Sequence, residues 1–336
     1  MKTINKITFA FFVFISCCVA VYQFASQKPK IFHVSKKPIL ALSWILPEQT
    51  IECVSSDGKI HKFLGDSLSG NTIQTQSKKW SKAVLAGEGK YLFATDSVDT
   101  ELWFIPSSKS LWRRRMRSKN VQNVGTEISA LSLSTDAKHL TIAEIFGNHG
   151  SVWVWDIKGG HIQPSSKEGI CAYPDVAENI AISPNGKLVA YGGETPGIGV
   201  WGRDVHHSLW GVGSFTTTNR PRLADAIALC FSPDGQLLAA SFLSGETMLL
   251  KPRTGSVVRT LPSKTTNRVL MFSPDSHLLS AGDGKGRVKI WNVVNGRAII
   301  DAPSGTAQIC SLAFSPDNTQ LAIGTSSGDV QLWRVK

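Results

Sequence analysis

The chain has 336 residues, of which 42% are hydrophobic and 18% charged, and its lysines and arginines outnumber its acids by 11. That apolar share excludes a disordered chain, a mean hydropathy of −0.02 excludes a polytopic membrane protein, and six cysteines are too few for a disulfide-dense scaffold. The positive charge is a first clue to function, because it is typical of proteins that bind nucleic acids.

The N-terminal segment accounts for more than half of that positive charge. The first 37 residues contain six lysines and no acid, and residues 7–27 contain no charged residue. A basic start followed by such an apolar run is typical of a secretory signal peptide or an uncleaved signal-anchor. Its length approaches the ~20 residues that span a bilayer. We therefore expect residues 1–27 to be a signal peptide or signal-anchor that forms a hydrophobic helix.

The residues around this run leave its processing and its orientation open. Cys18-Val19-Ala20 matches a signal-peptidase site only loosely. Lys2 and Lys6 favour a cytoplasmic N-terminus, whereas four lysines between residues 28 and 37 favour the opposite orientation. We favour a body that is membrane-anchored or secreted and lies outside the cytoplasm.

A repeated motif predicts the fold. Phe231, Phe272 and Phe314 each begin a Phe-Ser-Pro-Asp sequence, and they lie 41 and 42 residues apart. Weaker copies occur at residues 131–142 and 180–190, and degenerate copies occur at residues 42–51 and 83–93. After each copy, a second strand pattern ends on a large apolar residue: Phe63, Trp103, Trp155, Trp201, Leu250, Trp291 and Trp333. The chain therefore contains seven similar units.

Each unit reads as four short strands. An alternating apolar strand runs into Ser-Pro-Asp-Gly, in which proline fixes φ and the aspartate and glycine favour a turn. A second strand, a short polar loop, a third strand and a glycine turn follow. Four strands per ~40–45 residues form one blade of a β-propeller. We predict an all-β fold, in which residues 39–336 form a single seven-bladed β-propeller of four-stranded blades behind an N-terminal hydrophobic helix.

The units resemble those of the WD-repeat (β-transducin-like) family in a divergent, bacterial-type form, and Tol-type periplasmic propellers are a second match. The resemblance rests on the Phe-Ser-Pro-Asp turns and on strands such as Val152-Trp-Val-Trp-Asp156 and Val288-Lys-Ile-Trp291. It implies that a set of tryptophans is structural: Trp103, Trp155, Trp201, Trp291 and Trp333. The family's Gly-His pair before the first strand is absent from every unit, and Lys285 and Ser327 stand at the position of its aspartate in the last two units. The family's Trp–Ser/Thr–His–Asp hydrogen-bond network is therefore not carried over.

The last unit contains only three strand patterns, because the sequence ends three residues after Trp333. An open ring would leave unpaired strand edges. Residues 30–36 read as a lone strand before the first unit, so we expect residues 28–38 to supply the fourth strand of the last blade.

One cluster of cations is a candidate contact for an anionic surface. Arg113, Arg114, Arg115, Arg117 and Lys119 lie within seven residues. They could hold lipid headgroups, at about 1 kcal/mol per cation, or nucleic-acid phosphates. The alternative is that these charges protect the edge of a sheet from pairing with another chain, and we favour this interpretation. No aromatic residues interleave with them as a single-strand binder requires.

No catalytic, cofactor-binding or metal-binding residue is predicted. Gly324-Thr-Ser-Ser-Gly328 matches a nucleophile elbow but lies in a predicted hairpin. His206 and His207 are adjacent, so on a strand they point to opposite faces. Gly282-Asp-Gly-Lys-Gly286 lacks the Walker spacing. Four acids could line a central pore: Asp175, Asp204, Asp225 and Asp283. Disulfide connectivity cannot be deduced from the cysteine spacing.

Two functions remain open. The first is a non-enzymatic scaffold, a monomeric propeller that binds a protein or peptide through one face, and the WD-repeat resemblance favours it. The alternative is an extracytoplasmic propeller enzyme, lactonase- or dehydrogenase-like, with its site at the central channel. Three or more convergent acids or histidines at the channel mouth would favour the enzyme. Nucleic-acid binding rests on net charge alone, and we do not favour it.

Overall fold

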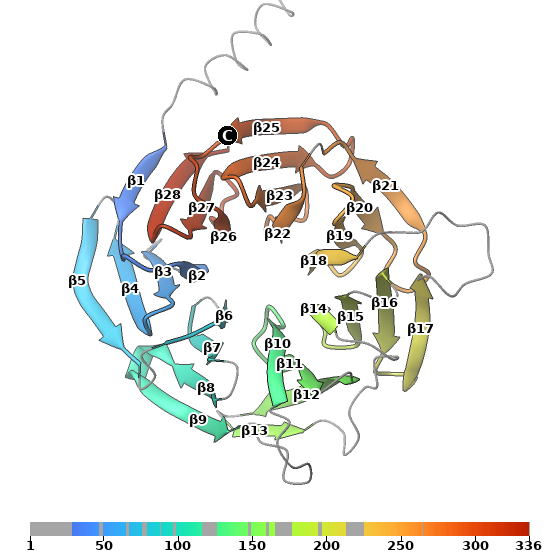
Figure 1. The fold of residues 1–336 in the computed structure, drawn as a ribbon, viewed down its shortest axis with the longest axis horizontal. Helices are drawn as coiled ribbons and strands as arrows, with labels where there is room; N and C mark the ends of the chain where they lie inside the picture. Colours follow the sequence, from blue (N-terminus) through green and yellow to red (C-terminus); the bar gives the residue numbers. More distant parts are fainter. Residues whose placement is uncertain are drawn as a thin grey trace, which may run out of the picture.

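Seven four-stranded antiparallel sheets surround a central axis in the computed structural model (Figure 1). It describes residues 29–46, 50–64, 67–75, 79–87, 89–96, 99–115, 126–146, 149–158, 161–164, 177–193, 197–212, 225–263 and 265–335. The predicted all-β, seven-bladed propeller with four-stranded blades is confirmed. The predicted hydrophobic helix falls within residues 1–27, which lie outside the described residues.

The two inner strands of each blade carry most of the apolar core. The innermost strands are β2 (Ile39–Ile45), β6 (Lys82–Ala86), β10 (Thr126–Leu133), β14 (Ala177–Ile182), β18 (Ala226–Phe231), β22 (Asn267–Phe272) and β26 (Ile309–Phe314). The second strands are β3 (Thr50–Ser55), β7 (Tyr91–Thr95), β11 (His139–Phe146), β15 (Leu188–Gly193), β19 (Leu238–Phe242), β23 (Leu278–Asp283) and β27 (Gln320–Thr325). Both sets are largely buried because neighbouring blades cover them on both sides.

The two outer strands complete each blade. The third strands are β4 (Lys59–Leu64), β8 (Asp99–Phe104), β12 (His149–Lys158), β16 (Gly197–Gly202), β20 (Thr247–Leu250), β24 (Arg287–Asn292) and β28 (Asp329–Arg334). The outermost strands are β5 (Ser67–Gln74), β9 (Lys109–Arg115), β13 (His161–Pro164), β17 (His207–Val212), β21 (Val257–Leu261), β25 (Ala298–Pro303) and β1 (Lys30–His33). A short 3-10 helix, η1 (Ile105–Ser107), joins β8 to β9.

The meander of each blade gives the disc two different faces. Each innermost strand starts on the face that we call the loop face, where connections arrive from the preceding blade and where the second strand joins the third. The opposite face, which we call the turn face, holds the turns between the first and second strands and between the third and fourth strands. We number the blades one to seven from β2, so that blade seven contains β26, β27, β28 and β1.

The Ser-x-Asp turns on the turn face are built by side chains. In blade seven the Ser315 hydroxyl donates to Asp317 Oδ1, and the Gln320 amide donates to Ser315 Oγ at 2.9 Å. The same pattern recurs in four other blades, at Ser134–Asp136, Ser183–Asn185, Ser232–Asp234 and Ser273–Asp275. These bonds fix the turn as an Asx-type structure that reverses the chain between two buried strands.

The hydrophobic core lies between blades rather than within them. One cluster joins Ala228, Leu249 and Leu261 of blade five to Leu270 and Trp291 of blade six. Equivalent clusters fill the other seams. Each blade therefore needs its neighbours to bury its apolar faces, which is the physical basis of a ring of repeats.

Strand β1 is the outermost strand of the sheet that holds the C-terminal strands (Figure 1). Lys30 lies opposite Leu332, and His33 lies opposite Asp329. Phe32 packs on Phe63 of blade one, with ring centroids 5.4 Å apart. The first segment that the structure describes thus pairs with the last strand and covers the seam between blades seven and one.

Candidate interaction surfaces

The mouth of the propeller on the loop face is formed by the first residues of the innermost strands. In six of these strands the register with the second strand shifts by one residue near the start. The extra residues differ in chemistry from blade to blade, and they are Leu40, Ser129, Glu178, Ile227, Arg268 and Cys310. β-Bulges redirect side chains at the edges of sheets. The six bulge residues therefore form a ring whose side chains differ from blade to blade, although the strands around them are alike.

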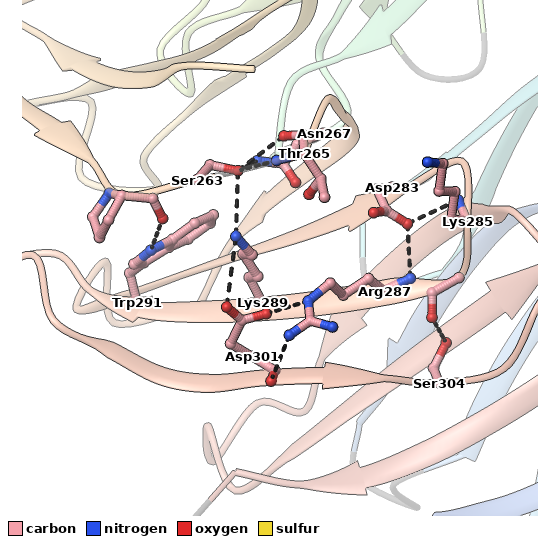
Figure 2. A network of polar contacts seen from close by, with 12 residues as sticks. Ser263, Thr265, Asn267, Asp283, Lys285, Arg287, Lys289, Trp291, Asp301 and Ser304 are labelled. Atoms are coloured by element: carbon pink, nitrogen blue, oxygen red, sulfur yellow. Dashed lines mark hydrogen bonds and ion pairs between the residues drawn. The ribbon is translucent and has the colours of Figure 1, made fainter.

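Arg268 stands out in this ring because it is exposed beside a rigid loop of its own blade. Asp283 is buried, and its Oδ1 accepts hydrogen bonds from the amides of Lys285 and Arg287 at 2.9 and 2.7 Å (Figure 2). A Cβ on Gly284 would lie 3.2 Å from Arg268 Nε. Lys285 follows Gly284 in this loop, and Lys285 and Arg268 are both exposed.

Leu243 adds an exposed apolar side chain to the same region. It follows β19 on the loop face and is 54% exposed. Its backbone is held by a hydrogen bond from its amide to the Asp225 carbonyl at 2.9 Å, and by Thr266 Oγ1, which donates to the Leu243 carbonyl at 3.5 Å. Thr266 is two residues from Arg268, so we define Leu243, Arg268 and Lys285 together as the 5–6 loop surface.

A polar network in blade six surrounds the buried side chain of Lys289 (Figure 2). The Lys289 side chain is only 4% exposed, and its Nζ lies 3.6 Å from Asp301 Oδ2 and 3.5 Å from Ser263 Oγ. Asn267 Nδ2 donates to the same Ser263 Oγ at 3.1 Å, and Trp291 Nε1 donates to the Pro262 carbonyl at 3.2 Å. The loop that leads into β22 is therefore fixed to the third strand of blade six.

The position two residues before the blade tryptophan is polar and buried in several blades. Glu101 Oε2 accepts from Trp103 Nε1 at 2.6 Å, and Gln331 Oε1 accepts from Trp333 Nε1 at 3.2 Å. Lys289 occupies the same position in blade six, two residues before Trp291, and is also buried. The sequence signal for them was this single recurring position, two residues before each tryptophan.

Two buried carboxylates lie in blades one and two, outside the loop surface. Burial raises the pKa of Glu52, and the ion pair with Lys62, 2.6 Å from its Oε1, opposes that shift. Glu101 Oε1 lies 3.3 Å from Arg113 Nε. Each acid thus has one cation beside it. They lie in neighbouring blades and do not form an acid–base pair.

The predicted basic cluster is only partly described. Arg113 lies on β9, and its guanidinium pairs with Asp99 at 3.2 Å as well as with Glu101. Arg114 and Arg115 end the same strand, and their side chains are outside the described part. Arg117 and Lys119 lie outside the described residues. Arg113 is thus tied to its own blade, and the use of the cluster as an anionic-surface contact stays a prediction.

The predicted repeat tryptophans all lie on third strands. Trp103, Trp155 and Trp291 are buried, and Trp201 and Trp333 are partly buried. Each packs in the cluster that joins two blades.

The other candidate residues are dispersed. Asp204 lies in a turn-face loop, where Arg253 donates to it at 2.6 Å and lowers its pKa. Asp225 and Asp283 are on the loop face but serve separate loops, and Asp175 lies outside the described residues. His206 and His207 end a turn-face loop. Among the described residues, no three His, Cys, Asp or Glu side chains are grouped so that they could hold a metal.

The described cysteines are thiols in separate blades. Burial raises the pKa of Cys230 to about 11, and it raises the pKa values of Cys53 and Cys310 as well. All three are therefore protonated and poorly nucleophilic at neutral pH.

Comparison with known proteins identifies the repeat. The family described as "WD domain, G-beta repeat" matches residues 255–292 and 298–334. These two segments are similar to WD repeats. Each begins on the outermost strand of one blade, β21 or β25, and ends on the third strand of the next, β24 or β28. A WD repeat is thus offset from a blade by one strand, and the same offset places a lone outermost strand, β1, at the start of the ring.

A solved structure titled "Crystal Structure of Mitotic Checkpoint Complex" has the same fold. The two chains superpose with a TM-score of 0.71 at 16% sequence identity, over 93% of this chain and 96% of that one. No curated protein matches the chain. The likeness to bacterial and Tol-type propellers stays a prediction.

The membrane prediction rests on sequence alone. In the part of the chain that the structure describes, no helix has the length and apolar character needed to cross a bilayer. The apolar run of residues 7–27 lies outside that part.

Proposed function

We propose that this chain is a non-enzymatic WD-repeat scaffold that binds a protein or peptide partner through the loop face of its propeller. Residues 1–27 would tether it to a membrane or export it, with the propeller outside the cytoplasm. The observation that carries the proposal is the 5–6 loop surface, which contains exposed Leu243 and the exposed cations Arg268 and Lys285 of two neighbouring blades.

The chemistry of this surface fits an acidic segment with an apolar anchor. An exposed aliphatic side chain flanked by cations provides burial on binding and charge complementarity to a partner. The backbone below it is fixed by Asp283 and by the Ser263–Lys289 contacts, so little conformational entropy is lost on binding. WD-repeat propellers generally bind protein partners, and the fold neighbour is titled as a complex. Fold alone does not assign a function, so the argument depends on this surface.

Affinity capture with matched variants tests the proposal. The full chain would be compared with Leu243→Asp and Arg268→Glu on the loop face and with Arg297→Glu on the turn face. All three positions are exposed, so melting temperatures should stay near that of the wild type. We expect both loop-face variants to lose the same captured protein and Arg297→Glu to retain it. Capture of one unchanged set by all four proteins would contradict the proposal.

A further inference from the structure

Exposed apolar side chains are distributed unequally between the two faces. Of the large hydrophobic residues that are exposed in the described part of the chain, only Leu243 lies on the loop face. The others lie on the turn face or on the adjoining ends of outermost strands, and they are Ile31, Leu46, Leu111, Val205, Val257, Val258, Val294 and Ile299. Eight of these nine exposed side chains therefore lie on or beside the turn face, and exposed apolar side chains that gather in one patch are typical of an interaction site.

Blades five to seven carry the densest part of this set. Val257 and Val258 begin β21, Ile299 lies near the start of β25, and Ile31 lies near the start of β1. Val294 follows β24 and is 69% exposed. The guanidinium of Arg259 on β21 donates to the Val294 carbonyl at 2.8 Å, which links blades five and six at this point. We call these five residues the aliphatic rim, and β21, β25 and β1 follow one another around the disc (Figure 1).

Cations lie among these aliphatic residues. Lys251, Arg297 and Arg334 are exposed and lie in or beside the turn-face ends of blades five, six and seven. The acids of the same blades on this face, Asp234, Asp275 and Asp317, lie in the turns between the two inner strands and thus closer to the axis. The outer edge of the turn face is therefore apolar and basic.

Strand β1, the first strand of the described part of the chain, begins at this same edge. Strand β1 runs antiparallel to β28, so its first residue, Lys30, lies toward the turn face and His33 toward the loop face. Only Lys28 and Pro29 separate Lys30 from the uncharged residues 7–27. A membrane that held those residues would lie next to the aliphatic rim.

We infer that the aliphatic rim of blades five to seven docks on an anionic bilayer surface, so that the loop face points away from the membrane. This inference rests on the membrane tether of the proposed function. Aliphatic side chains enter the boundary between headgroups and acyl chains, and the neighbouring cations contact anionic headgroups. The orientation leaves the 5–6 loop surface free for its partner.

Hydrogen exchange on the full chain tests the docking. The protein would be reconstituted in nanodiscs of phosphatidylcholine with phosphatidylglycerol, and in detergent micelles as the reference. Amides in residues 251–259 and 292–299 should exchange more slowly in the nanodiscs, while residues 243–246 on the loop face should not change. Val294→Asp should weaken docking about tenfold, which is the effect of losing one buried aliphatic side chain. The control Leu243→Asp should leave the protection intact.

Several outcomes would overturn the inference. Equal exchange in nanodiscs and micelles, with the chain still resistant to extraction by alkaline carbonate, would reject the docking and leave the tether standing. Release of the chain by carbonate would reject the tether and the docking together. Protection of the rim in micelles that grows with protein concentration would show that a second copy covers it instead.

Discussion

The residues of the Ser-x-Asp turns show how a short motif determines local structure. The serine hydroxyl and the aspartate carboxylate each take a backbone or side-chain partner, so the turn is closed by at least two side-chain hydrogen bonds. The sequence predicted these turns from Ser-Pro-Asp alone, because all of the partners lie within five residues. Contacts between blades were not predictable in this way, because they join residues about one repeat apart.

The lowered pKa values of the turn aspartates make the stability of the fold depend on pH in a predictable direction. Hydrogen bonds from Ser315 and the Thr319 amide lower the pKa of Asp317. A lowered pKa in the folded state stabilises the fold fully above the unfolded value of about 3.9, and this stability is lost as the pH falls through the folded value. Urea unfolding at several pH values should therefore show stability falling below about pH 4.

Two substitutions test the origin of that dependence. Asp317→Asn should reduce the loss of stability on acidification, and Asn185→Asp, in the uncharged copy of the turn, should increase it. If the stability of the wild type and of both variants fell identically with pH, the turn aspartates would not be its cause.

Gly186 and Gly235 occupy the same turn position but differ in their surroundings. Both have positive φ, +68° and +70°. A Cβ on Gly186 would overlap the His139 ring, whereas one on Gly235 would meet nothing nearer than Pro184 at 3.9 Å. Gly235→Ala should cost about 1 kcal/mol from backbone strain. Gly186→Ala should cost about 3 kcal/mol, because a steric clash is added. Equal losses in urea midpoint would show that His139 moves aside freely.

Among the strands, β1 has the clearest individual role. It pairs with β28, and its Phe32 covers the seam to blade one. The sequence predicted a strand here because an open ring leaves unpaired edges. The partner of Phe32 was not predictable, because Phe63 belongs to a different blade. The buried polar groups at Glu101, Lys289 and Gln331 were missed because each also needs a partner outside its own strand. These partners are Arg113 on β9, Asp301 on β25 and the Ser304 carbonyl on the loop before blade seven.

Closure of the ring by β1 is testable with neighbouring residues. Phe32→Ala should lower the free energy of unfolding by about 2 kcal/mol, because Phe32 is partly buried against Phe63. Ile31→Ala is the control, since Ile31 is 50% exposed and its loss should change stability by less than about 0.5 kcal/mol. Calorimetric melting would measure both. Equal, small effects would mean that β1 does not hold the seam.

In the whole molecule, the two faces have different surfaces. The loop face carries the variable bulge residues and the 5–6 loop surface, and the turn face carries the apolar, basic edge. Repeat spacing predicted the number of blades, because that spacing is a property of the chain alone. The division of chemistry between faces required the topology, which determines where each strand begins.

Site-directed photo-crosslinking in cells tests the binding face most directly. A photoreactive amino acid at Leu243 or Lys285 should give a discrete adduct with one partner, and Arg268→Glu should abolish it. The same amino acid at Arg297, exposed on the turn face, should give none. Adducts of equal yield at Arg297, or adducts at Leu243 that survive Arg268→Glu, would contradict the assignment of partner binding to the loop face.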